Sequence, residues 1–180
     1  MVKIIGIGGS LRTNSYSMQA LQLAINDAQA AGATVQVLDL REMSLPFCDG
    51  GDSYPDHPDV AVLQEAVKGA DGLILATPEY HGSVSGVIKN ALDLMSFTEL
   101  SGKVVGLISV LGGQPNSNAL NELRLIMRWV HAWVIPEQIA IGQAWQAFDA
   151  DGTLKDEKLA QRFVQFAKSL VTNTQKLTAQ

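Results

Sequence analysis

Residues Gly9 to Ser17 combine the side chains and backbone groups that bind anions. A short apolar run, Ile4 to Ile7, ends in two glycines, and a hydroxyl-rich segment containing Arg12 follows before helical periodicity begins. The first backbone N–H groups of a helix lack partners within it, and the helix dipole places partial positive charge there. Hydroxyl groups add donors, and a guanidinium group suits phosphate. We therefore predict a phosphate-bearing ligand at residues 9–17, against the alternative that Gly-Gly-Ser is only a tight turn.

The common nucleotide motifs do not fit this segment. A Rossmann fingerprint starting at Gly6 needs Gly or Ala at position 11, which is Leu11, and no G-K-S or G-K-T of a P-loop occurs in the chain. A loop of hydroxyls and backbone N–H groups suits a mononucleotide monophosphate better than a triphosphate, which normally brings magnesium.

Two further segments have the composition of ring-binding loops. TPEYHGS, Thr77 to Ser83, follows one apolar run, and SVLGGQ, Ser109 to Gln114, follows another. Proline and glycine give rigid edges that approach a ligand closely, and Tyr80 and His81 offer flat faces. An ordinary strand-to-helix turn is the alternative for TPEYHGS. A phosphate at the first loop and a planar ring at the next two describe flavin mononucleotide, FMN.

Alternating strands and helices must position these three loops. Apolar runs and β-branched residues predict strands, and apolar spacings of three and four predict helices. The strands are expected at residues 4–7, 34–40, 72–76, 104–110 and 134–141, and the helices at 18–31, 60–68, 85–95, 118–132 and 159–170. The run at 34–40 alternates and indicates an edge strand, whereas 72–76 is apolar throughout and indicates a strand buried on both faces. Residues 41–58 form a long loop, which is typically functional or mobile.

This alternation predicts an α/β doubly wound sheet of five parallel strands in the order 2-1-3-4-5, with helices on both faces. Ligands of such sheets bind at the carboxyl ends of the strands, where the direction of winding reverses between strands 1 and 3. The first two loops, 8–17 and 77–83, would then lie together.

Length and composition restrict the other possibilities. The 180 residues are expected to form a single domain, 1–180, and a net charge of −5 without a basic cluster argues against nucleic acid or an anionic membrane. No apolar run reaches the length of a membrane span and no secretory leader is evident, so we expect a cytoplasmic protein without membrane insertion. The single Cys48 excludes an internal disulfide, and no histidine pair has metal-ligand spacing, so no metal site is expected.

The segments GSLRTNS, TPEYHGSVSGVIKNALD and the Gly-Gly loop after the fourth strand resemble the NADPH-dependent FMN reductase family of flavodoxin-like proteins. That family includes quinone, azo-compound and chromate reductases, and the resemblance covers about residues 2–142. It implies that Ser10, Arg12, Ser15 and Ser17 hold the FMN phosphate. It also implies that the isoalloxazine is bordered by Pro78, Glu79, Tyr80, His81 and Gly82 on one side and by Ser109, Gly112 and Gly113 on the other.

The chain departs from the family pattern at a few positions. Many relatives carry asparagine where this chain has Ser17 and His81, and the loop from Gly112 to Asn118 is poorer in glycine and lacks an arginine often found nearby. The first change keeps a hydrogen-bond donor. His81 bears on substrate preference, and the loop from Gly112 to Asn118 bears on the choice between NADPH and NADH.

The resemblance implies an enzyme in which FMN accepts a hydride from NADPH or NADH and passes electrons to a small-molecule acceptor: FMN, a quinone, an azo compound or a metal ion. No catalytic acid or base is assigned to the protein. Two alternatives are a flavodoxin-type electron carrier and an FMN-binding regulatory module whose 41–58 loop contacts a partner.

Other residues are expected to have structural roles. Arg124 and Arg128 share one helix face, which we interpret as solvated rather than as a nicotinamide phosphate site or a subunit contact. Trp129, Trp133 and Trp145 are interpreted as core or interface residues. The helix at 85–95 is apolar on more than one side, which indicates a helix either deeply buried or shared with another subunit, and we predict a homodimer. The resemblance also implies a homodimer or homotetramer with flavin near the interface.

Overall fold

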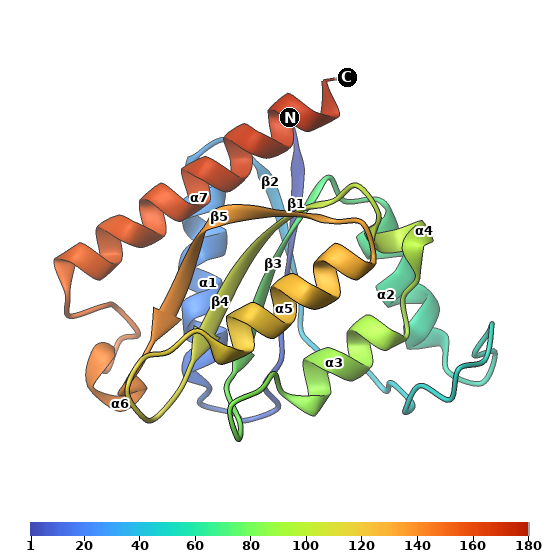
Figure 1. Ribbon diagram of the computed structural model, residues 1–180, viewed down its shortest axis with the longest axis horizontal. Coiled ribbons are helices and arrows are strands. Elements are labelled where there is room, and N and C mark those ends of the chain that lie inside the picture. Colours follow the sequence, from blue (N-terminus) through green and yellow to red (C-terminus); the bar gives the residue numbers. More distant parts are fainter. Residues whose placement is uncertain (180) are drawn as a thin grey trace.

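The structure, a computed structural model, describes residues 1–179; Gln180, the last residue of the expected domain, lies outside the described residues. Strands and helices alternate along the chain (Figure 1). In order, they are β1 (Lys3–Gly8), α1 (Tyr16–Ala30), β2 (Thr34–Leu38), α2 (Pro58–Lys68), β3 (Gly72–Pro78), α3 (Gly86–Asp93), α4 (Phe97–Leu100), β4 (Val104–Val110), α5 (Asn118–Trp129), β5 (Trp133–Ile141), α6 (Ala144–Ala147) and α7 (Glu157–Thr178).

The strands form one parallel sheet in the order β2-β1-β3-β4-β5, as the sequence predicts. All residues of β3 and β4 are buried, because helices cover both faces of these interior strands. β2 alternates between exposed and partly buried residues before it ends at the buried Leu38, as expected at a sheet edge. The expected strand at 72–76 is two residues too short, because Thr77 and Pro78 still pair with Ser109 and Val110 of β4.

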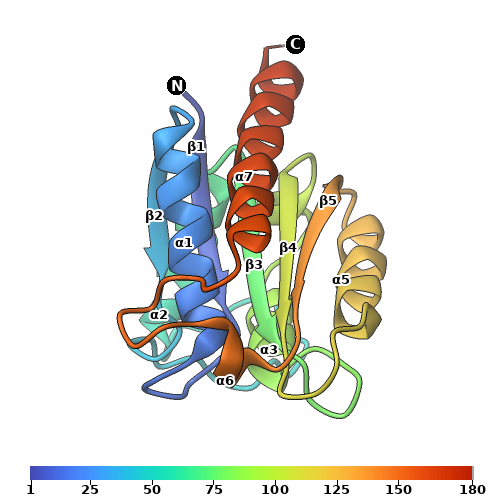
Figure 2. The ribbon, with the colours of Figure 1, turned by 90° about the vertical axis from the view of Figure 1, so that its left-hand side faces the viewer.

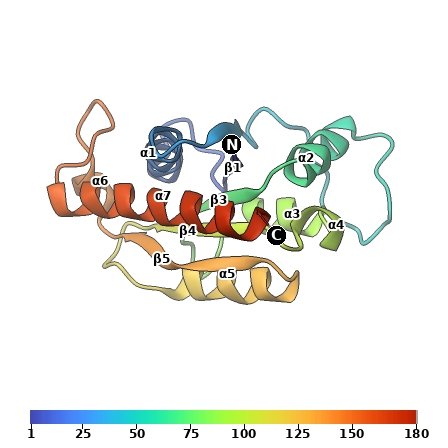
Figure 3. The ribbon, with the colours of Figure 1, turned by 90° about the horizontal axis from the view of Figure 1, so that it is seen from above.

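Two helix layers sandwich the sheet. α1 and α7 pack together on one face, in front of the strands in Figure 2. α2, α3 and α5 cover the other face, and Figure 3 shows α1 and α5 on opposite sides of the strands. Each layer buries its own apolar cluster, one containing Phe163 and Phe166 of α7 and the other containing Leu63 of α2 and Leu123 of α5.

The edge strand β5 is irregular around Pro136. It advances from Val134 to Gln138 while its partner β4 advances only from Val105 to Leu107. Proline has no N–H for the ladder, and carbonyl groups in the displaced stretch of β5 need partners outside the regular pairing. Arg124 of α5 supplies them, because Nη2 donates to the carbonyls of Ile135 at 3.0 Å and Pro136 at 3.1 Å. The solvated role expected for Arg124 is therefore wrong, and burial lowers the pKa of its guanidinium group.

Two short helices, α4 and α6, were not expected from the sequence. Each has four residues, too few to produce a periodic apolar pattern. Ser96 and Glu99 start α4 with a reciprocal capping box. Among residues 1–179, none of the helices is both long enough and apolar enough to cross a bilayer.

Candidate functional site

The carboxyl ends of the strands share one edge of the sheet, at the bottom of Figure 2, and the segments that follow them meet there. A cavity of about 370 Å³ opens between these segments. Residues from four stretches line it: 10–17, 78–80, 110–112 and 144–145. It lies where the strand order reverses between β1 and β3, the place where doubly wound sheets bind ligands.

Buried hydroxyl groups surround the cavity at the N-terminus of α1. Ser10, Ser15 and Ser17 are 3%, 5% and 2% exposed. The Oγ of Ser15 caps α1 by accepting a hydrogen bond from the N–H of Met18 at 3.3 Å, and it lies 2.8 Å from the Oγ of Ser17. Arg12 lies at the rim, exposed and without an ion pair among residues 1–179. Hydroxyls, helix N–H groups and an unpaired guanidinium thus face one space, which suits an anion.

Gly9 brings the first loop against α3. A Cβ at this position would lie 2.7 Å from the Oγ of Ser85 and 2.8 Å from the Cβ of Ile88, so only glycine fits. The Ser85 hydroxyl donates to the carbonyl of Gly9 at 2.6 Å and caps α3 by accepting from the N–H of Ile88, while the N–H of Ser85 donates to Thr77 Oγ1 at 3.1 Å. One serine therefore joins the ends of β1 and β3.

Arg41 supports the first loop from outside. Its Nη1 donates to the carbonyl of Thr13 at 3.2 Å, and its Nε donates to Asp39 at 2.8 Å. These hydrogen bonds lower the pKa of the Asp39 carboxyl group, with burial opposing the shift. Arg41 is neutralised by Asp39, so Arg12 is the cation that lines the cavity.

The second loop is a tight turn with two left-handed residues. Tyr80 and Ser83 exchange backbone hydrogen bonds of 3.1 and 3.0 Å, and between them His81 has φ 54° and Gly82 has φ 78°. Positive φ at both central positions defines a type I′ turn, in which asparagine followed by glycine is favoured. A Cβ on Gly82 would meet its nearest neighbour at 3.6 Å, an ordinary contact. The backbone angle, rather than close approach to a ring, therefore requires glycine here.

Two carboxylates fasten this turn to α5. Glu79 accepts a hydrogen bond from the Nδ2 of Asn116 at 2.8 Å and a longer one from the N–H of Ala119 at 3.3 Å. On the other side of the turn, Ser83 donates to Glu122 at 2.5 Å. Ser117, the N-cap residue of α5, makes no side-chain capping bond, so Glu79 supplies the cap from another loop.

The loop after β4 is held against the end of β5. Leu111 donates to the carbonyl of Ile141 at 2.9 Å, and Gln143 donates to that of Gly113 at 2.8 Å. This pairing brings Ala144 and Trp145 of α6 to the cavity. Trp145 is 61% exposed and Trp129 and Trp133 are exposed too, so none of the three tryptophans belongs to the core.

Within residues 1–179, no group of three or more His, Cys, Asp or Glu side chains is arranged to hold a metal ion. The charged side chains that line the cavity are Arg12 and Glu79, and the Glu79 carboxylate already accepts hydrogen bonds from Asn116 and Ala119.

Comparison with known sequences identifies the family. The sequence pattern of the NADPH-dependent FMN reductases matches residues 2–146. The chain belongs to that family. This FMN reductase is 33% identical to the NADPH-dependent FMN reductase ArsH of Rhizobium meliloti over 178 residues, covering 96% of this chain and 72% of the relative. It is 34% identical to an NAD(P)H-dependent FMN reductase of Pseudomonas aeruginosa, covering 94% of this chain and 93% of the relative.

A further relative agrees with the family, and solved structures agree with the fold. An FMN-dependent NADPH-azoreductase of Staphylococcus haemolyticus is 33% identical, with 92% of each chain covered. The flavoenzyme NAD(P)H:(acceptor) oxidoreductase FerB of Paracoccus denitrificans superimposes with a TM-score of 0.75 at 22% identity, covering 98% of both chains. An archaeal flavodoxin superimposes with a TM-score of 0.67 at 12% identity, covering 96% of this chain and 99% of the other. The fold is therefore flavodoxin-like.

The cavity of this FMN reductase has the chemistry that FMN needs. Three nearly buried hydroxyls and Arg12 provide donors for a phosphate, while Pro78, Tyr80, Val110 and Leu111 provide apolar and aromatic surface for a ring. The family uses FMN and NAD(P)H, and this chain is an NAD(P)H-dependent FMN oxidoreductase.

Eight of the residues expected at the FMN site line the cavity: Ser10, Arg12, Ser15, Ser17, Pro78, Glu79, Tyr80 and Gly112. His81, Gly82, Ser109 and Gly113 lie outside its lining. His81 and Gly82 form the outer end of the turn, and Ser109 is fully buried in β4, where its Oγ has no hydrogen-bond partner among the described residues. Sequence reasoning missed Tyr16, Val110, Leu111, Ala144 and Trp145. The position of Ala144 and Trp145 directly after the last strand was the available signal.

Proposed function

We propose that this cavity binds FMN, with the phosphate at the N-terminus of α1 and the ring against the ends of β3 and β4. One observation carries the proposal: a single cavity joins the buried hydroxyls of the first loop to the edges of two neighbouring strands. The phosphate ligands in this proposal are Ser10, Arg12, Ser15 and Ser17. Pro78, Tyr80 and Gly112 border the ring. Glu79, His81, Gly82, Ser109 and Gly113 support the segments that hold these three residues.

The protein's part in the reaction is to bind, orient and shield. Bound FMN supplies hydride and electron transfer between NAD(P)H and an acceptor. Trp145 and Leu111 provide an outer apolar wall that limits the access of water. The acceptor in this proposal is a small molecule: FMN, a quinone, an azo compound or a metal ion. Relatives named as FMN reductases and as an azoreductase support this range.

The experiment begins with the visible spectrum of the purified protein, with NADPH or NADH then added without oxygen. We expect a flavin spectrum that bleaches with a nicotinamide, and comparison of the two donors gives the preference. Flavin that stays oxidised with both donors would favour the electron carrier or the regulatory module.

A second titration tests the location of the cofactor. Flavin-free protein is titrated with FMN and with riboflavin, which lacks the phosphate. We expect FMN to bind much more tightly, because charge-assisted hydrogen bonds to phosphate are lost with riboflavin. Equal affinity for FMN and riboflavin would contradict the placement of the phosphate at the N-terminus of α1.

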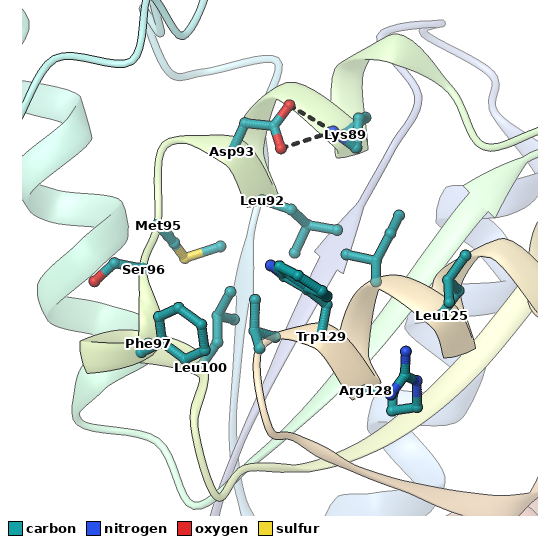
Figure 4. Close-up of a pocket in the computed structure, with 12 residues that line it drawn as sticks. Lys89, Leu92, Asp93, Met95, Ser96, Phe97, Leu100, Leu125, Arg128 and Trp129 are labelled. Atoms are coloured by element: carbon teal, nitrogen blue, oxygen red, sulfur yellow. Dashed lines mark hydrogen bonds and ion pairs between the residues drawn. The ribbon is translucent and has the colours of Figure 1, made fainter.

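We also propose that this enzyme forms a homodimer, or a homotetramer built from it, through the face made by α3, α4 and α5. A groove of about 780 Å³ separates α5 from α3 and α4, and Trp129, Leu92 and Phe97 project into it (Figure 4). Phe97, Leu125 and Trp129 are 50%, 60% and 70% exposed. Clustered exposed apolar groups are typical of protein interfaces. A second copy of the chain would cover them on both subunits at once.

Two broader proposals concern the chain as a whole. We propose that residues 1–180 form one domain, since both apolar clusters pack on the same sheet; limited proteolysis should then give no stable fragment. We propose a cytoplasmic location, supported by the free thiol of Cys48, which suits a reducing compartment. Cell fractionation tests it.

A further inference from the structure

A second cavity of about 370 Å³ lies beside the proposed FMN site. Its walls include Leu11 of the first loop, Met43, Leu45 and Phe47 of the 41–57 segment, Tyr80 of the turn and Val87 of α3. Tyr80 lines both cavities, and Leu11 lies between two residues that line the first, Ser10 and Arg12. A molecule in the second cavity would therefore be a close neighbour of the cofactor.

Hydrogen bonds fix the wall made by the 41–57 segment. The side chain of Asn90, on α3, donates to the carbonyl of Pro46 at 2.8 Å and accepts from the N–H of Cys48 at 2.9 Å. At the start of the segment, Ser44 donates to Asp59 of α2 at 2.6 Å. The segment between β2 and α2 is thus irregular but anchored to two helices. Anchoring keeps the cavity open without a ligand, which reduces the entropic cost of binding.

The lining selects for uncharged, apolar ligands. No charged side chain lines this cavity. Two of its polar side chains are engaged, since the amide of Asn90 holds residues 46 and 48, and the hydroxyl of Ser85 bonds to Gly9 and Ile88. A charged molecule would lose its hydration here without gaining a partner of opposite charge. Phe47 is 89% exposed and Leu11 is 57% exposed, so apolar surface is available at the mouth.

We propose that this second cavity binds the apolar ring system of an uncharged organic electron acceptor, and that Phe47 and Asn90 determine the preference for such acceptors. The proposal rests on the FMN-dependent function proposed above. For a quinone, the hydride lost by NADPH and one proton from solvent convert the quinone to the hydroquinone, leaving NADP⁺. Charged acceptors react without occupying this cavity.

The test compares two acceptors on FMN-loaded protein: menadione, an uncharged naphthoquinone, and ferricyanide, an anion. Phe47→Ser removes an exposed apolar side chain, so folding is expected to be unaffected. We expect it to raise KM for menadione about tenfold, with kcat and the ferricyanide rate unchanged. Asn90→Ala, which releases the 46–48 wall, should change KM in the same direction. Val62→Ser removes an exposed aliphatic side chain of α2 that lines neither cavity and is the matched control.

A binding measurement separates this proposal from the general function. Equilibrium dialysis of menadione against oxidised protein without NADPH should give binding that weakens about tenfold in Phe47→Ser. Absence of menadione binding to the wild type, or equal losses with both acceptors, would overturn the proposal. Failure of NADPH to reduce ferricyanide through the wild type would instead overturn the proposed function, while dialysis still tests the cavity.

Discussion

His81 has a left-handed backbone conformation in the turn between Tyr80 and Ser83, with φ 54°. This region disfavours most side chains by roughly 1–2 kcal/mol, and asparagine tolerates it best after glycine. His81→Asn should raise the free energy of unfolding by a few tenths to about 1 kcal/mol. His81→Val should lower it. Chemical denaturation measures both changes; a stabilising valine would contradict the backbone explanation.

Arg12 is the cation at the proposed phosphate site, and it has no competing ion pair among the described residues. Arg12→Ala should weaken FMN binding by about 1.5–3 kcal/mol, the range for hydrogen bonds to charged groups. Isothermal titration of flavin-free protein measures the change. Arg162→Ala, on α7, is the control and should leave FMN affinity intact. Unchanged affinity in Arg12→Ala would remove this residue from the site.

Tyr54 ties the far end of the 41–57 segment together. Its hydroxyl contacts Cys48 Sγ at 3.6 Å and donates to Asp49 at 2.8 Å, and these hydrogen bonds raise the pKa of Tyr54 to about 12. Because the folded pKa exceeds the unfolded value of 10.0, the stabilisation is complete below pH 10 and is lost as the pH rises through about 12. In an absorbance titration at alkaline pH, the wild type should show a tyrosine ionisation near pH 12 that is missing from Tyr54→Phe.

At the scale of elements, α5 depends on a residue outside it. Glu79 caps its N-terminus and also lines the cavity, so one side chain couples helix stability to the ring site. Glu79→Ala should lower the free energy of unfolding by about 0.5–2 kcal/mol, as loss of a helix cap does, and should weaken FMN binding. Glu79→Gln keeps a hydrogen-bond acceptor for Ala119, so its losses of stability and of FMN affinity should be smaller than those of Glu79→Ala. Equal effects of the two variants would contradict the capping role.

The sequence was sufficient to predict the strands that are buried along their whole length. A strand buried on both faces, such as β4, is apolar at nearly every position, with Ser109 as the polar exception, and its bounds were predicted without error. Exact ends were less predictable elsewhere, because Thr77 and Pro78 read as a loop yet pair with β4. The role of Arg124 depends on the irregular register around Pro136 and on the contact of α5 with β5. No local pattern could show that contact.

At the scale of the whole molecule, the apolar groove of α3, α4 and α5 predicts self-association. Trp129→Asp should place a charge in the proposed interface and produce a particle with the mass of one chain, because an unpaired buried charge is costly. Light scattering after size exclusion measures the mass. Leu177→Asp, an exposed site on α7, should leave the assembly intact. A monomeric wild type, or a Trp129→Asp variant of unchanged mass, would contradict this interface.

The candidate site was partly predictable because topology alone brings its parts together. The order 2-1-3-4-5 places the first two loops at one edge, and the structure has that order. Trp145 was not predicted there, since its position depends on the pairing of Leu111 with Ile141 at the end of β5. Residue type indicated the chemistry, and contacts between distant segments decided which residues line the cavity.

The cavity takes its walls from Ser10 near one end of the chain and from Trp145 much further along it. It can exist only after β5 has joined the sheet, which is a late event for a parallel topology with long-range pairing. A chain in which β5 has not yet joined the sheet should therefore be unable to load FMN. Bound ligand then stabilises the finished fold by RT ln(1 + [L]/Kd). Cells short of riboflavin should degrade this protein faster, so that vitamin supply controls its abundance as well as its activity.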